Sequence, residues 1–443
     1  MKKLNFSKSV FFVFVLGLIS FSSCEKGEIC DDVTCPTGYL CDNGNCIVDP
    51  NATPSIKTEI KSGAITANET WSANNIYELA GKVIVQDGAT LTIDAGTIIK
   101  GRQGQGSLAS ALVIARGGKI IAEGTADKPI IFTSTLDDIK VGEKTGTNLK
   151  ETDHSKWGGL IILGKAKISA KIGDTEAQIE GIPADEVFGK YGGNDDSDNS
   201  GILKYVSIRH GGTLIGEGNE INGLTLGGVG SGTTINHVEI VGNLDDGIEC
   251  FGGSVDIEYA LVAYQQDDAF DIDQNFSGSF KNSVVIYDNT GDEFLEIDGP
   301  ENSTNVGGHF TIENCTFISK TGDGSVDMKS KAQGIIKNCK FEGLTKFKLS
   351  ASFKDNCTTE KTDAYTNYVA NPATLIVEDN NANAPIAIYT KSENDAEEAC
   401  PISDEMKSSV ETIFSGANNN SSAAGADLSE FDGWTWAKLN GKI

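Results

Sequence analysis

Arginine is nearly absent from this sequence of 443 residues, which contains Arg102, Arg116 and Arg209 and no other. A groove that binds polyuronate chains would normally use more, because arginine holds carboxylates through two parallel hydrogen bonds. The formal net charge is −27, from 63 acidic and 36 basic residues. This acidic excess argues against nucleic acid as a partner and favours cations, neutral glycans or simple solubility.

Long apolar runs are also missing after the first 23 residues, so no later segment is expected to cross a bilayer. Residues 1–23 combine a basic start, a short apolar run and small residues before Cys24, which predicts a signal peptide and lipidation of Cys24. The alternative is a signal peptide cut just before an ordinary disulfide cysteine. We expect an outer membrane lipoprotein, exposed at the cell surface, that contacts the membrane through its N-terminal lipid anchor.

Residues 24–50 contain few apolar side chains with which to build a core, but they hold four closely spaced cysteines. In an exported chain this composition predicts a stalk held by two disulfides, and spacing alone allows three pairings. The run CDDVTCPTGYLCDNGNC resembles the first part of an EGF-like module, which implies the pairs Cys30–Cys41 and Cys35–Cys46. The third EGF disulfide is missing. We interpret residues 51–80 as a linker and N-terminal cap.

Proline is scarce, with 9 residues against 51 glycines, which is typical of a turn-rich all-β chain. Six segments repeat one pattern of apolar, polar, Tyr/His/Asn, small, variable and apolar residues, and they begin at Leu203, Ile235, Ile257, Phe280, Ile312 and Ile336. Repeats of about two dozen residues with β-branched strands and glycine corners are typical of a β-solenoid. We therefore predict an all-β, right-handed parallel β-helix over residues 81–355, followed by C-terminal coils and a cap over residues 356–443.

The third position of each repeat is expected to lie at a bend and to stack with its neighbours, where asparagines can form a hydrogen-bonded ladder. His237 occupies this column, so we interpret it as a turn residue. Cys315 and Cys339 should also stack, either as a disulfide or as buried thiols. Cys357 and Cys400 lie beyond the coils and are better candidates for a disulfide.

Phrases such as WGGLIILGKA, NEINGLTLGGVG and DDGIECFGG occur between about Lys82 and Phe294. They resemble Gram-negative surface lipoproteins with a right-handed parallel β-helix, a family of unknown function whose members are often labelled multidrug transporters. The resemblance implies the fold and surface anchoring, and it implies no catalytic residue. A short echo, FDGWTWA, places Trp434 and Trp436 near the C-terminus, where we expect them to cap the last coil beside a weak helix at residues 402–414.

Carboxylates recur at matching positions of consecutive coils. If the apolar residues of these strands point inward, strand alternation sends one column outward, formed by Glu249, Asp271, Glu296 and Asp327. Further charged positions form a second column and the corners: Asp273, Asp298, Lys329, Asp246, Asp268 and Glu293. Stacked like charges repel, and a bound Ca²⁺, raised carboxyl pKa values or solvent screening would relieve the repulsion. A separate loop with Asp195, Asp196 and Asp198 predicts either a second Ca²⁺ site or a polar turn.

Three classes of function fit these features. The favoured one is a non-catalytic module that binds glycan, Ca²⁺ or both through the acidic face, with Asp246, Asp268, Glu293 and Lys329 contacting the ligand. The second is a polysaccharide lyase or glycoside hydrolase that uses the carboxylates and Lys329, although the GDD, GHG and RIK motifs of polygalacturonase-like chains are incomplete here. The third is a structural or transporter-associated surface protein. The sequence assigns no catalytic residue and no oligomeric state.

Overall fold

The structure is a computed structural model that describes residues 29–30, 33–35, 39–42, 45–49, 56–170, 175–183, 186–215, 221–301, 304–382, 387–396, 398–415 and 418–443. The chain divides into two compact units, Met1–Ser55 and Ile56–Ile443. The predicted signal peptide and the predicted lipidation site Cys24 lie outside the described residues. No helix in the described ranges is both long and apolar enough to span a bilayer.

The first unit contains short antiparallel strands tied by disulfides. Its strands pair as β1 (Ile29–Cys30) with β2 (Val33–Thr34) and β3 (Tyr39–Asp42) with β4 (Asn45–Val48). Cys35 and Cys46 form a disulfide with Cα atoms 5.4 Å apart, which confirms the pairing implied by the EGF-like resemblance. Cys41 is also disulfide-bonded, and the side chain of Cys30, its expected partner, lies outside the described residues.

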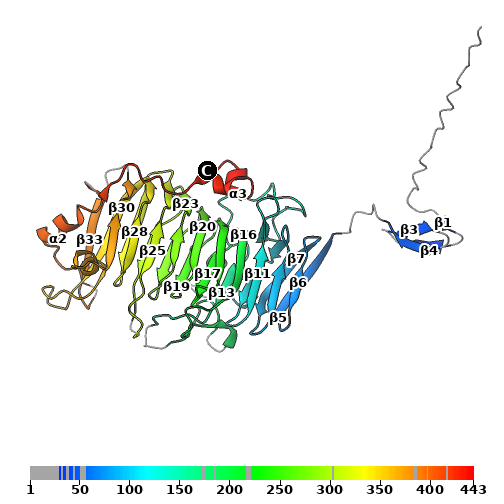
Figure 1. Cartoon of the computed structure of the whole chain (residues 1–443), viewed down its shortest axis with the longest axis horizontal. Helices are drawn as coiled ribbons and strands as arrows, with labels where there is room; N and C mark the ends of the chain where they lie inside the picture. Colours follow the sequence, from blue (N-terminus) through cyan, green and yellow to red (C-terminus); the bar gives the residue numbers. More distant parts are fainter. Residues whose placement is uncertain are drawn as a thin grey trace, which may run out of the picture. The chain divides into compact units, whose positions relative to one another are not determined.

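The second unit is the predicted parallel β-helix, in which 27 strands pair in parallel and successive coils add strands to three faces, here named A, B and C (Figure 1). Face A contains β10 (Ala111–Ile114), β13 (Leu160–Leu163), β17 (Leu224–Gly227), β19 (Ile248–Phe251), β21 (Phe270–Asp273), β24 (Leu295–Asp298), β27 (Gly324–Lys329), β30 (Leu344–Ser352) and β33 (Ala387–Glu393). Face B contains β6 (Glu69–Trp71), β8 (Thr90–Ile93), β11 (Lys119–Glu123), β22 (Ser279–Lys281), β25 (Phe310–Glu313), β28 (Gly334–Lys337) and β31 (Leu375–Glu378).

Face C contains β9 (Ile98–Gly101), β12 (Ile130–Ser134), β23 (Val284–Tyr287), β26 (Thr316–Ser319), β29 (Lys340–Glu342) and β32 (Asn381–Ala382). Longer strands bend from one face into the next: β5 (Lys57–Ile65) and β7 (Asn75–Val85) from C to A, and β16 (Gly201–Arg209), β18 (Thr234–Val241) and β20 (Asp256–Ala263) from B to C. The short strands β14 (Ala177–Gln178) and β15 (Lys190–Tyr191) pair with each other outside the coils.

The predicted coil register is confirmed at all six repeats, because the starting residues pair in sequence from Leu203 to Ile336. The third position adopts the left-handed conformation in every repeat, with φ between 48° at Tyr205 and 56° at His237 and Asn314. The ring of His237 stacks on its neighbours in this column, and Asn338 donates a side-chain hydrogen bond to Asn314. Asparagine tolerates this left-handed conformation better than most residues. At this column the chain turns from face B to face C.

The remaining cysteines follow the sequence interpretation. Cys315 and Cys339 are free and buried in the interior of the coils, which selects the thiol alternative. Cys357 and Cys400 form a disulfide with Cα atoms 5.3 Å apart, as predicted. This bond joins the end of β30 to the segment that follows β33, and so ties together the last coils.

The solenoid begins earlier than the sequence predicted, whereas its last coils and its cap lie within the predicted residues 356–443. The parallel ladder begins at Lys57, within the segment expected to be linker and cap, because β5 pairs along β7 from Lys57 to Ile65. At the other end, α1 (Ala364–Val369) is inserted between β30 and β31, and α2 (Asp404–Val410) closes the last coil. The cap is formed by α2 rather than by the tryptophans, since Met406, Val410 and Ile413 join the main core.

The C-terminal segment, residues 425–443, runs back along the solenoid (Figure 1, red). Phe431, Trp434 and Trp436 pack on outward residues of β18, β20 and β23, with the Trp434 ring edge-on to Tyr205 at 5.4 Å. The expectation that Trp434 and Trp436 cap the last coil is therefore wrong. Their apolar surface instead covers the outside of face C, where β-branched and alanine side chains leave a flat apolar surface.

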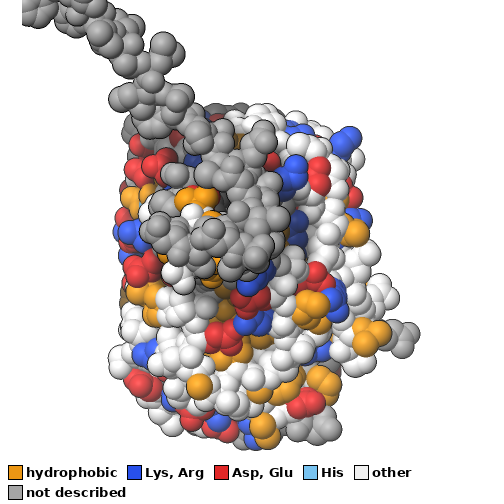
Figure 2. Space-filling view, turned by 90° about the vertical axis from the view of Figure 1, so that its right-hand side faces the viewer, with side chains coloured by type: hydrophobic (Ala, Val, Ile, Leu, Met, Phe, Trp, Pro, Cys, Tyr) orange, Lys and Arg blue, Asp and Glu red, His pale blue; other side chains and the backbone are white. Residues whose placement is uncertain are grey.

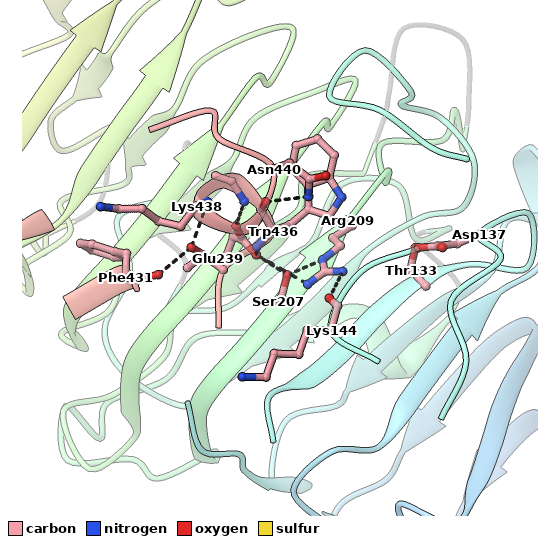
Figure 3. Close-up of polar contacts among 12 residues, drawn as sticks. Thr133, Asp137, Lys144, Ser207, Arg209, Glu239, Phe431, Trp436, Lys438 and Asn440 are labelled. Atoms are coloured by element: carbon pink, nitrogen blue, oxygen red, sulfur yellow. Dashed lines mark hydrogen bonds and ion pairs between the residues drawn. The ribbon is translucent and has the colours of Figure 1, made fainter. Parts of the chain in front are cut away.

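Glu239 and Arg209 anchor this segment from below (Figure 3). The Glu239 carboxylate, which is fully buried, accepts the backbone N–H groups of Trp436 at 2.8 Å and Ala437 at 2.9 Å, at the start of α3 (Trp436–Leu439). Its Oε2 also lies 3.9 Å from Nη2 of Arg209, which is likewise fully buried and donates to the carbonyl of Lys144 at 2.8 Å. Arg209 thus has a structural role.

Candidate functional site

The outer surface of face A changes character along the solenoid. The same outward column is apolar in the first coils, at Ile84, Val113 and Ile161, and becomes acidic from Glu249 onward. The described residues of the range 164–200, here called the cover segment, lie over the apolar part, where their side chains form a second hydrophobic core against β7, β10 and β13. Tyr191 of this segment reaches the acidic part and donates a hydrogen bond to Gln274 at 3.1 Å.

The predicted carboxylate ladder, Glu249, Asp271, Glu296 and Asp327, is in register. Each residue pairs with the next across β19, β21, β24 and β27. Their apolar neighbours, Ile248, Phe270, Leu295 and Val326, belong to the main core, so the inward and outward assignment is correct. The ladder is not the open face that alternation suggested, however, because Glu249 and Asp327 are each 6% exposed.

Lysines neutralise the C-terminal half of the ladder. Lys329 pairs with Glu296 and lies 3.5 Å from Asp298, and Lys348, one coil further, pairs with Asp327. The sequence had placed Lys329 in the same column as Asp298. Lys348 was missed, although it stands 21 residues after Asp327 and continues the same column, so extending the repeat would have found it.

The N-terminal half of the ladder is arranged differently. Ligand oxygens of Asp246, Glu249 and Asp271, here called the carboxylate triad, all lie within 4.8 Å of one another. In the described part of the chain, no lysine or arginine forms an ion pair with any of the three. Oδ1 of Asp271 is buried and has no hydrogen-bond partner there.

Asn222 lies at the edge of the triad. Its Nδ2 donates to Glu249, while its buried Oδ1 has no donor among the residues described. The side chain is 1% exposed, so water does not replace the missing partner at the surface. Asn222 had no signal in the sequence, because it precedes β17 at a corner and does not belong to the repeated pattern. Together with Asp271, it supplies a buried oxygen that has no hydrogen-bond partner among the described residues.

Burial raises the pKa of Asp246, Glu249 and Asp271 well above the usual carboxyl range, and the neighbouring carboxylates add to this effect. Glu180 of the cover segment lies close enough for its charge to raise the pKa of both Asp246 and Glu249. Without a cation, the triad would therefore have to keep protons at neutral pH.

The raised pKa values extend beyond the triad. Burial is again the main cause, and it raises the pKa of Asp268 to about 11 and those of Glu293 and Asp298 to about 7. Asp273 lies beside Asp298 in the second column, where its charge contributes to the raised pKa of Asp298.

The corner carboxylates predicted to contact a ligand have a structural role. Oδ1 of Asp246 accepts the backbone N–H of Asp268 at 3.0 Å, and Oδ1 of Asp268 accepts that of Glu293 at 2.9 Å. Asp246 and Asp268 are 7% and 3% exposed, which leaves little surface for a glycan. Each corner thus satisfies a backbone donor of the following coil, and Asp246 retains its second oxygen for the triad.

The carboxylates of the second predicted Ca²⁺ site form separate contacts. Asp195 accepts hydrogen bonds from the N–H and hydroxyl of Ser197, Asp196 pairs with Lys167 at 2.6 Å, and Asp198 accepts from Ser200 at 3.2 Å. The three carboxylates therefore do not converge on one point. The polar-turn alternative describes this loop.

Four aromatic side chains along the coils are also not exposed for stacking on sugars. Tyr264 and Tyr287 are 3% and 0% exposed, and Trp434 and Trp436 are covered as described above. Figure 2, which looks at the solenoid from its right-hand side in Figure 1, shows acidic and basic side chains interspersed on the visible face.

Comparison with known proteins gives one result. The model of the pectate-lyase-like β-helix domain matches residues 63–438, a range that includes the cover segment, the ladder and most of the C-terminal segment. No curated protein and no solved structure matches the chain.

Proposed function

We propose that this chain, which belongs to the pectate-lyase-like β-helix domain family, is a surface protein that binds glycan without catalysis. We further propose that it holds Ca²⁺ in its carboxylate triad. The observation that carries the proposal is the contrast within one ladder. Lysines neutralise Glu296 and Asp327, whereas no lysine or arginine of the described residues forms an ion pair with the triad. A divalent cation would supply the missing charge at the one part of the ladder that the protein itself leaves acidic.

The donor set favours Ca²⁺ over other metals. The triad offers carboxylate oxygens alone, and Asn222 adds an amide oxygen. Hard oxygen ligands in an irregular set suit Ca²⁺, which accepts six to eight oxygens at flexible angles, with water completing the shell. Zinc would call for histidine or cysteine ligands. Ca²⁺ at this position would also join the cover segment to face A, because Glu180 lies close to Asp246 and Glu249.

The residues that a catalytic mechanism would need are engaged elsewhere. Lys329, the predicted base of a lyase, is held by ion pairs with Glu296 and Asp298. Arg209, which could have stabilised a substrate carboxylate, is fully buried under α3. These contacts support binding over catalysis, although family membership alone is compatible with a polysaccharide lyase. The proposal retains the lipid anchor at Cys24 and a cell-surface location in the outer membrane.

The function is tested by incubating the full chain with neutral and acidic polysaccharides, in Ca²⁺ and in EDTA. We expect retention of the protein in polysaccharide gels that weakens in EDTA, because Ca²⁺ removal loosens the cover segment. We also expect no new reducing ends and no ultraviolet absorbance from unsaturated products. Unsaturated products that disappear in a Lys329→Met variant would instead establish a lyase.

A further inference from the structure

A pocket of about 830 Å³ opens between the cover segment and the corners that follow three strands of face A. Gln86 and Asp87 follow β7, Arg116 follows β10, and Lys165 follows β13. The opposite wall is part of the cover segment and includes Phe188. None of the triad or ladder carboxylates lines this pocket, so it is separate from the proposed Ca²⁺ site.

The pocket is lined by three acidic side chains, Asp87, Glu176 and Asp195, and by two basic ones, Arg116 and Lys165. Nη1 of Arg116 pairs with Glu176 and donates to the carbonyl of Gly192 at 2.8 Å, which fixes the guanidinium against the cover segment. Asp87 and Lys165 both stand over Gly117, where an added Cβ would lie 1.9 Å from Oδ1 of Asp87 and 3.1 Å from Nζ of Lys165. Glycine at position 117 thus leaves the space that these two side chains use.

This mixture of charges decides which ligand fits. A strongly anionic ligand would meet three carboxylates, those of Asp87, Glu176 and Asp195, and a cationic ligand would meet Arg116 and Lys165. A neutral ligand with many hydroxyl groups meets neither penalty, because paired carboxylates, amides and cations can donate to or accept from hydroxyls. Gln86 and Asn194 add two amides to this set.

The pocket also has an apolar side. Phe188 is half-buried in the partly apolar wall, and Val187, which is 80% exposed, stands next to it. The C–H face of a sugar ring packs on such side chains while its hydroxyls reach the polar groups opposite. The volume lies in the range of pockets that hold small organic ligands.

We propose that this pocket binds a neutral saccharide unit, with Phe188 against the ring and Asp87, Gln86 and Asn194 on its hydroxyls. The inference rests on the proposed glycan-binding function and assigns that function to a definite place and substrate class. We therefore place the glycan site at the corners beneath the cover segment, and not on the acidic face where the sequence suggested it.

The test is affinity electrophoresis of the full chain through gels that contain xylan, galactomannan or β-glucan, with polygalacturonate and alginate as acidic comparators. We expect retention by at least one neutral polysaccharide. Phe188→Ala and Asp87→Ala should each raise the dissociation constant about fivefold to tenfold, which corresponds to the loss of one ring contact or one hydroxyl contact. Leu136→Ala and Asp94→Ala, at exposed positions outside the pocket, are matched controls that should not change retention.

The outcomes separate the inference from the function on which it rests. Retention that is equal in wild type, Phe188→Ala and Asp87→Ala would overturn the pocket assignment and leave glycan binding intact. Retention by the acidic polysaccharides alone would overturn the neutral ligand class. No retention in any gel would overturn the glycan-binding function and the inference together. Circular dichroism of each variant shows whether it is folded.

Discussion

Replacing Glu239 by alanine should lower the free energy of unfolding by about 3–5 kcal/mol, the range measured when one partner of a buried ion pair is removed. The variant leaves the Arg209 guanidinium buried without its counter-ion. It also removes the acceptor of the first two backbone N–H groups of α3, at Trp436 and Ala437. Chemical denaturation followed by circular dichroism measures the loss.

Two further variants sharpen this prediction. Arg209→Met should cost less than Glu239→Ala, because Glu239 keeps the hydroxyl of Ser207 and both backbone donors of α3. Glu123→Ala, at an exposed glutamate of β11, should stay within about 0.5 kcal/mol of wild type. If Glu239→Ala unfolds like Glu123→Ala, the carboxylate does not anchor the C-terminal segment. Limited proteolysis gives a second readout, since loss of the anchor should expose residues 425–443 to cleavage.

Stability should also depend on pH and Ca²⁺ in a linked way. In the folded chain, burial raises the pKa of Glu293 and Asp298 to about 7 and those of the triad carboxyls well above their usual range. The folded state therefore keeps protons that the unfolded state releases above about pH 4. In EDTA, the free energy of unfolding should fall as pH rises from about 4 through 7 and beyond.

Ca²⁺ should reverse this trend because it binds the ionised carboxylates and competes with protons. At a Ca²⁺ concentration 100-fold above the dissociation constant we expect about 2.7 kcal/mol of added stability at pH 8 and much less at pH 5. Thermal unfolding in Ca²⁺ and in EDTA at both pH values measures the linkage. A melting temperature in EDTA that does not fall between pH 5 and pH 8, or a Ca²⁺ effect that is larger at pH 5, would contradict it.

The coils could be predicted from the sequence because their pattern repeats. The register from Leu203 to Ile336 and the order of the ladder carboxylates follow from alternation and spacing alone. The pattern was lost after Ile336, whose partner in the next coil is Val377, because the insertion that contains α1 lengthens the interval to 41 residues. The first coil was missed for a related reason, since β5 has one neighbour and exposes much of its length.

What lies on the outside of the coils could not be predicted in the same way. Strand alternation predicts which side chains point out of the coil, but it does not predict which segment packs over them. Glu249 is buried because Asn222 contacts it, and Trp434 is buried because the chain turns back over face C. Both depend on contacts between segments far apart in the sequence. The pocket beside Phe188 likewise forms only when the cover segment meets the corners of three coils.

The central claim is that Ca²⁺ occupies the part of the ladder that lacks lysine, and equilibrium dialysis with Ca²⁺ at neutral pH tests it most directly. Wild type and Glu296→Gln should bind Ca²⁺ alike, because Lys329 already neutralises Glu296. Glu249→Gln, the same change one step along the same column, should weaken binding at least tenfold, since it removes a charged ligand from the triad. Absence of Ca²⁺ binding in wild type, or a loss confined to Glu296→Gln, would contradict the account.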